Sequence, residues 1–113
     1  MAGSKKTNPV KKMKYTLIIR PEAENDIASA YSWYELQSKG LGSNFILCVD
    51  ACLWAIQRTP QIYPKIYKTI HRALTRRFPY EIFYIVKGKK IIVLAVLHAK
   101  RNPLHWQNRY LNN

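Results

Sequence analysis

The chain has 113 residues, of which 48% are hydrophobic and 12% aromatic, so it can build one packed core and does not have the composition of a disordered protein. Its 19 Lys and Arg against six Asp and Glu give a formal charge of +13, which indicates an acidic partner: nucleic acid, an anionic membrane surface or an acidic protein. The longest apolar run, Ile91 to Leu97, falls far short of the roughly 20 residues that span a bilayer, and no signal-peptide pattern follows the basic N-terminus. We therefore expect a cytoplasmic protein with no membrane partner.

Cysteine usage and motif content also limit the function. The two cysteines, Cys48 and Cys52, are spaced as neighbours on one helix face, where thiols usually act as small hydrophobic groups. No disulfide framework, metal-ligand cluster, glycine-rich phosphate loop or H-E-x-x-H motif occurs. We expect no cofactor and no metal.

The N-terminal half predicts a strand followed by two helices. Residues 1–12 are polar and basic, so we expect a flexible lead-in to a single domain over residues 13–113. Alternating apolar residues from Tyr15 to Arg20 predict a strand. Pro21 then begins a helix with acidic residues in its first turn, and an apolar stripe at three- and four-residue steps continues until near Gly40.

After the Gly40-Leu41-Gly42 break, a second apolar stripe from Phe45 to Ile56 predicts another helix, which ends at Thr59-Pro60. The short connection indicates an antiparallel helical hairpin whose two stripes cover another apolar layer.

That layer is predicted from the C-terminal half, where three strand-like runs follow: Thr69 to Phe78, Glu81 to Lys87, and Lys90 to His98. Gly88 marks a hairpin turn, and the run from Ile91 to Leu97 is apolar on both faces, which is typical of an inner strand. Asn102-Pro103 can cap a short terminal helix that carries Trp106 and Tyr110. The fold class is α+β: a strand, a two-helix hairpin, and three antiparallel strands packed on the hairpin.

Charge is unevenly distributed over this plan. Five of the six acidic residues lie in the helical hairpin, whereas the segment from Lys65 to Arg109 contains eleven Lys and Arg and the single acid Glu81. The strand-rich half is therefore the electropositive half.

The arginines of the second predicted strand are the first candidate site. Strand periodicity places Arg72 and Arg76 on one face, and His71 and Arg77 on the other. Guanidinium groups bind phosphate or carboxylate in a bidentate manner, although a run of charge is equally typical of a solvated sheet face.

The end of the inner strand is the second candidate site, because His98 is followed closely by Lys100 and Arg101. A histidine there can transfer protons, but strand-end histidines more often hydrogen-bond the backbone. Tyr84 is a further candidate for proton transfer, although its place in an alternating apolar strand favours packing.

Two segments carry a resemblance to a known family. RALTRRFPYEIFYIV (residues 72–86), a glycine turn, and IIVLAVLHAKRNP (91–103) resemble the RelE/ParE superfamily of toxins from type II toxin–antitoxin, or plasmid stabilisation, systems. The hairpin pattern EAENDI…YSWYE (22–35) adds more general support. The resemblance implies a growth-arresting toxin with a four-stranded antiparallel sheet packed on a helical hairpin, inhibited by an acidic antitoxin that wraps around it.

The superfamily divides by target. RelE-like members cleave ribosome-bound mRNA without a metal, and ParE-like members inhibit DNA gyrase by binding. For a nuclease, the resemblance and the chemistry of cleavage nominate proton-transfer groups and cations, which here are His98, Tyr84, Arg72, Arg76 and Arg101. For binding a target or an antitoxin, the candidates are Arg72, Arg76, Arg77, Lys100 and Arg101.

Two features favour the ParE-like branch. Glu81 occupies the position after Tyr80 where RelE-like nucleases often have an arginine, and a carboxylate there repels a phosphate. The predicted hairpin is also long, at about 17 residues per helix. The alternatives are a RelE-like endoribonuclease, a member of the family that only binds, and a non-catalytic basic RNA-binding module.

Overall fold

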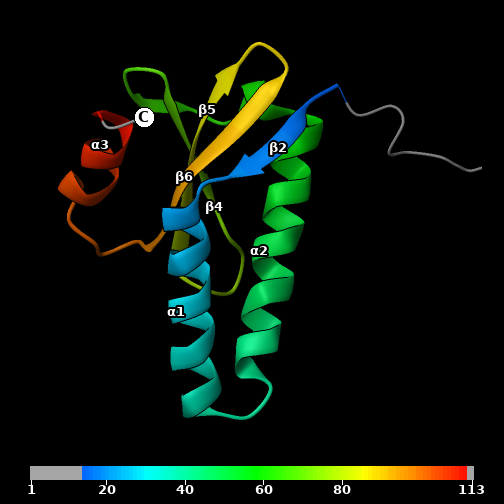
Figure 1. Cartoon of the computed structure of the whole chain (residues 1–113). Coiled ribbons are helices and arrows are strands. Elements are labelled where there is room, and N and C mark those ends of the chain that lie inside the picture. Colours follow the sequence, from blue (N-terminus) through cyan, green and yellow to red (C-terminus); the bar gives the residue numbers. More distant parts are fainter. Residues whose placement is uncertain (1–13, 112–113) are drawn as a thin grey trace, which may run out of the picture.

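A computed structural model describes residues 14–111, so the predicted lead-in at residues 1–12 lies outside the described part of the chain. The elements follow in this order: β2 (Thr16–Ile19), α1 (Pro21–Gln37), α2 (Leu41–Arg58), the short 3-10 helix η2 (Pro60–Ile62), β3 (Lys65–Tyr67), β4 (Ile70–Leu74), β5 (Tyr80–Lys87), β6 (Lys90–His98) and α3 (Leu104–Leu111). The predicted α+β class is confirmed, with the hairpin of α1 and α2 packed against a sheet (Figure 1).

The sheet differs from the expected four-stranded antiparallel one. It has five strands in the order β2-β6-β5-β4-β3, and β2 pairs with β6 in parallel. The three residues of β3 are too few to produce an alternating pattern, so the sequence did not reveal this edge strand. The parallel direction of β2 could not be predicted from the local sequence either, because it is set by how the helical hairpin returns the chain to the sheet.

The α1–α2 hairpin covers one face of the sheet. Phe45, Val49, Leu53 and Ile56 are the buried apolar residues of α2, at the predicted helical spacing. The connection is held by Glu35, whose carboxylate accepts the backbone N–H groups of Gly40 and Gly42, each at 2.9 Å. This carboxylate replaces the side-chain cap that α2 lacks.

The other face of the sheet is covered by α3. Trp106 stacks on Phe83 with ring centroids 4.9 Å apart. Arg109 reaches past the sheet and forms a two-pronged ion pair with Asp26 of α1. Because both faces are covered, β6 is buried along most of its length, which confirms the predicted inner strand.

β4 ends earlier than predicted. It stops at Leu74, and residues 75–79 form a turn in which the Thr75 hydroxyl donates to the carbonyl of Phe78 at 2.7 Å. Arg77 adopts a left-handed backbone conformation there, with φ at 72°. The expectation that Arg76 and Arg77 alternate along a strand is therefore wrong, because threonine and proline turn chemistry overrides the extended pattern.

Within residues 14–111, no helix combines the length and the apolar character needed to cross a membrane. Nor does the described part of the chain bring three or more His, Cys, Asp or Glu side chains together in a way that could hold a metal ion.

Candidate functional site

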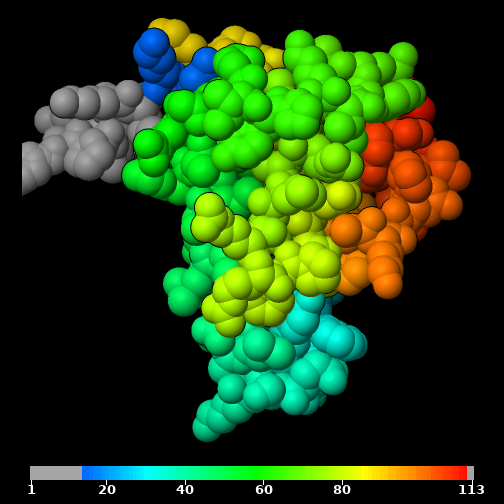
Figure 2. All heavy atoms as spheres, turned by 180° about the vertical axis from the view of Figure 1, so that it is seen from behind, coloured from blue at the N-terminus to red at the C-terminus, as the bar shows by residue number. Residues whose placement is uncertain are grey.

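Two connections meet at one end of the sheet, and we call them together the loop edge: residues 75–79 between β4 and β5, and residues 99–103 between β6 and α3. The backbone N–H of Ala99 donates to the carbonyl of Pro79 at 2.8 Å and joins them. The exposed cations at the loop edge are Arg76, Arg77, Lys100 and Arg101. Figure 2 shows the first of these connections, in yellow-green, beside the projecting end of the helical hairpin. Four of the predicted binding residues are therefore exposed on two adjacent loops.

Arg72 lies elsewhere. It extends from β4, and its guanidinium Nη1 lies 3.5 Å from the carboxylate of Glu81 on β5. Glu81 pairs with Leu74, two residues along β4 from Arg72, and this diagonal offset of two brings both side chains to the same face. Glu81 was predicted to repel a phosphate at this position, and its ion pair also neutralises one of the candidate cations, Arg72.

Tyr84 and His71 are enclosed on the hairpin side of the sheet. Tyr84 is fully buried, its hydroxyl donates to the carbonyl of Pro60 at 2.8 Å, and burial raises its pKa strongly. His71 stacks on it at 4.9 Å and bonds the carbonyl of Tyr63 through Nδ1. Packing against the helices therefore withdraws the Tyr84 hydroxyl from the surface, which favours the packing alternative for this residue.

His98 lies at the end of β6, partly exposed. Its Nδ1 accepts the backbone N–H of Lys100 at 3.1 Å. When the ring is neutral, this bond places the proton on Nε2, which remains available as a donor. The predicted alternative, in which this histidine hydrogen-bonds the backbone, therefore holds for Nδ1, while Nε2 has no such bond within residues 14–111.

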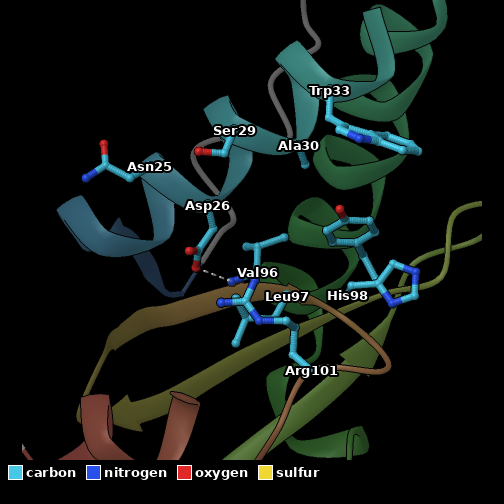
Figure 3. Close-up of a pocket in the computed structure, with 10 residues that line it drawn as sticks. Asn25, Asp26, Ser29, Ala30, Trp33, Val96, Leu97, His98 and Arg101 are labelled. Carbon is cyan, nitrogen blue, oxygen red and sulfur yellow. Dashed lines mark hydrogen bonds between the residues drawn. The ribbon is translucent and has the colours of Figure 1, made fainter. Parts of the chain in front are cut away.

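A pocket of about 300 Å³ opens between α1 and the end of β6. Asp26 and Trp33 line it from the helix, and His98 and Arg101 line it from the sheet end (Figure 3). Tyr80 also belongs to the lining. The Asp26 carboxylate also accepts the backbone N–H of Val96 at 3.0 Å, in addition to its pair with Arg109 outside the pocket lining.

A second, larger hollow of about 540 Å³ lies between α2 and the end of β4, and we call it the α2 groove. Leu47 and Leu74 line it although they are 66% and 61% exposed, and Arg76 and Arg77 form its basic rim. Cys52 also faces it, and burial raises the pKa of this thiol to about 11. Both cysteines are free and pack beside the core, as small hydrophobic groups do.

Comparison with known proteins places this geometry in a family. A family model described as the ParE toxin of the type II toxin–antitoxin system parDE matches residues 17–103, most of the chain. The chain belongs to the ParE toxin family. Toxin ParE2 of Mycobacterium tuberculosis is 27% identical over 92 residues, which cover 80% of this chain and 88% of that protein, with the same values in two strains.

A solved structure described as the chromosomal ParDE toxin–antitoxin system from P. aeruginosa has the same fold. It matches with a TM-score of 0.69 at 17% identity, over 76% of this chain and 97% of that one. The predicted RelE/ParE resemblance is thus confirmed on its ParE side, and this ParE-family chain is a toxin that pairs with an antitoxin.

The sequence did not reveal the parts that α1 contributes to the site of this ParE-family toxin. Trp33 was noted only as part of a general hairpin pattern, and Asp26 only as a helix-start acid. Their place beside His98 and Arg101 depends on packing between residues about 70 positions apart. The one available signal was a tryptophan lying off the apolar stripe of this helix, and the structure leaves that side chain 57% exposed.

Proposed function

We propose that this ParE-family toxin arrests growth by binding DNA gyrase through the loop edge, and that it does not cleave RNA. The observation that carries the proposal is that two of the cleavage candidates, Tyr84 and Arg72, are withdrawn from the exposed cations, so that His98 alone among the proton-transfer candidates lies beside them. Arg76, Arg77, Lys100 and Arg101 are each exposed on the two loops of the loop edge. In contrast, Tyr84 is enclosed and Arg72 is paired with Glu81. An exposed cluster of cations supports recognition of an acidic surface without chemistry.

The test compares charge removal at the two ends of the sheet. Arg76→Gln/Arg77→Gln and Lys100→Gln/Arg101→Gln should each raise the toxin concentration that half-inhibits gyrase supercoiling by about tenfold, equivalent to about 1.4 kcal/mol. The matched control, Lys89→Gln/Lys90→Gln, removes two exposed charges at the β5–β6 turn and should leave inhibition unchanged. Primer extension on mRNA from induced cells runs alongside. New cleavage ends with unaltered supercoiling would establish the RelE-like alternative instead.

For the antitoxin, we propose that an acidic amphipathic helix docks in the α2 groove. The floor is apolar and exposed, the rim carries Arg76 and Arg77, and the whole chain has a charge of +13. An apolar stripe flanked by carboxylates would match both features at once. In this arrangement the bound helix also covers part of the loop edge, which would couple antitoxin binding to inhibition of the toxin.

Leucine substitutions distinguish binding in the α2 groove from nonspecific hydrophobic binding elsewhere on the surface. Leu47→Gln and Leu74→Gln should each weaken binding of the antitoxin encoded beside the toxin by about tenfold. Leu36→Gln is the control, because Leu36 is 84% exposed on α1 and does not line the groove. Equal losses for all three variants in isothermal titration calorimetry would contradict this docking site.

A further inference from the structure

We propose that the pocket between α1 and the end of β6 binds one nucleoside monophosphate unit, with the phosphate at Arg101 and His98 and the base against Trp33. This proposal shares Arg101 with the loop edge, but it concerns a different ligand and rests on the geometry of residues that line one pocket.

The size of the pocket selects a small ligand. Its volume of about 300 Å³ is at the lower end of the range for small-molecule sites. A helix, at about 10 Å in diameter, does not enter such a space. A single nucleotide does, which distinguishes this pocket from the larger and more apolar α2 groove.

The anion end is built from two donors on the sheet side. Arg101 offers a planar fork of N–H groups that matches phosphate oxygens. His98 adds Nε2–H, because its Nδ1 is already occupied by the backbone of Lys100. In Figure 3, both side chains lie on the sheet side of the opening, below α1.

The one carboxylate in the pocket lining does not cancel this charge. Asp26 is held by the Arg109 guanidinium and by the N–H of Val96, so its charge is already balanced by groups behind the pocket wall. The positive charge of Arg101 is left for a ligand, since no ion pair involving it occurs among the described residues.

The base end is aromatic. Trp33 is 57% exposed, and its edge-on contact with Tyr34, at 5.1 Å and 83°, holds the indole while leaving ring surface uncovered. Tyr80 forms a second wall, braced by Phe45 at 4.9 Å and in contact with His98 at 5.4 Å. An exposed aromatic face beside cations stacks nucleobases of any sequence. Such a unit can come from a free nucleotide or from an unpaired position in a strand.

The experiment is a titration of the ¹⁵N-labelled full chain followed by NMR, with 5′-AMP, adenosine and inorganic phosphate as probes. AMP should shift the Trp33 indole N–H and the backbone signals of residues 98–101, and it should bind at least about tenfold more tightly than either half-ligand. Arg101→Gln should weaken AMP about tenfold and leave adenosine unchanged, whereas Trp33→Leu should weaken both.

Trp54→Leu is the matched control. Trp54 is 51% exposed on α2 with the Arg58 guanidinium 4.7 Å from its ring centroid, so it has the same chemistry without this pocket. The variant should bind AMP like the parent chain. AMP binding that survives Arg101→Gln, or that falls equally with Trp54→Leu, would overturn the proposal.

Two further probes separate the sources of the ligand. A single-stranded oligo-dA that binds more tightly than AMP through the same residues identifies a strand, and equal affinity identifies a free nucleotide. An N-acetyl-Trp-Glu peptide is the competitor. If the peptide displaces AMP and binds the pocket more tightly than AMP does, the pocket is a peptide site and the proposal is overturned. Because these readouts measure binding alone, they are independent of the supercoiling result.

Discussion

At the scale of single residues, Gly42 near the start of α2 has the least space around it of the glycines in the described chain. A Cβ on Gly42 would lie 2.7 Å from the carbonyl oxygen of Tyr31 and 2.9 Å from the Glu35 carboxylate. The same carboxylate caps α2, so crowding there disturbs both the helix contact and the cap. The requirement at this position is space, whereas Gly40 and Gly88 have open surroundings and positive φ.

Gly42→Ala should therefore lower the free energy of unfolding by about 1–3 kcal/mol, the usual cost of overpacking a well-filled site. Urea denaturation followed by circular dichroism measures it. Gly88→Asn is the control, since asparagine tolerates the left-handed conformation and nothing lies within 4 Å of the added Cβ. A Gly42→Ala variant as stable as the parent would show that the two helices separate easily.

At the scale of elements, α3 is attached to the hairpin through a side-chain bridge that passes the edge of the sheet. Arg109 joins Asp26 and also donates to the carbonyl of Leu94 at 3.2 Å. Asp26 raises the pKa of Arg109, so the guanidinium remains charged at any accessible pH. One carboxylate thus connects α1, β6 and α3.

Asp26→Asn should release α3, because the charged acceptor is lost while the size of the side chain is kept. We expect a loss of about 2 kcal/mol in unfolding free energy and faster tryptic cleavage after Arg101 and Arg109, quantified by mass spectrometry. Glu22→Gln, which breaks an exposed pair with Arg20, should be cleaved like the parent. Equal cleavage rates in all three proteins would mean that Trp106 alone holds the helix.

At the scale of the whole molecule, the net charge of +13 opposes folding through self-repulsion. The three ion pairs found among residues 14–111 offset little of it, since two of them join partly exposed side chains at 3.4 and 3.5 Å. Surface charges interact over about 10 Å at 0.1 M salt, and more salt screens them further. Repulsion should therefore outweigh attraction in the salt dependence of stability.

Raising NaCl from 0.05 to 0.5 M should increase the melting temperature by about 3 °C or more, measured by differential scanning fluorimetry. Lys89→Gln/Lys90→Gln, with less charge to screen, should gain less. A melting temperature that falls with salt would show that the ion pairs contribute more than the repulsion.

Local pattern accounted for most of the elements. Apolar spacing identified both long helices and the inner strand, and the glycine itself marked the turn at Gly88. Asn102 caps the terminal helix as predicted, accepting the N–H of Leu104 at 2.9 Å. These features depend on residues within about four positions of one another, and the amino-acid order records them directly. The uneven distribution of charge along the chain was equally readable.

The tertiary structure alone decided which of the predicted residues work together. It paired β2 with β6 in parallel, ended β4 before Arg76, buried Tyr84, and joined Glu81 to Arg72. It also placed Trp33 opposite Arg101 across one pocket. Strand direction and pocket walls arise from contacts between distant segments, which no local spacing encodes. The chain's basic character was therefore readable from its sequence, but the site where that charge can act exists only once the helical hairpin has packed on the sheet.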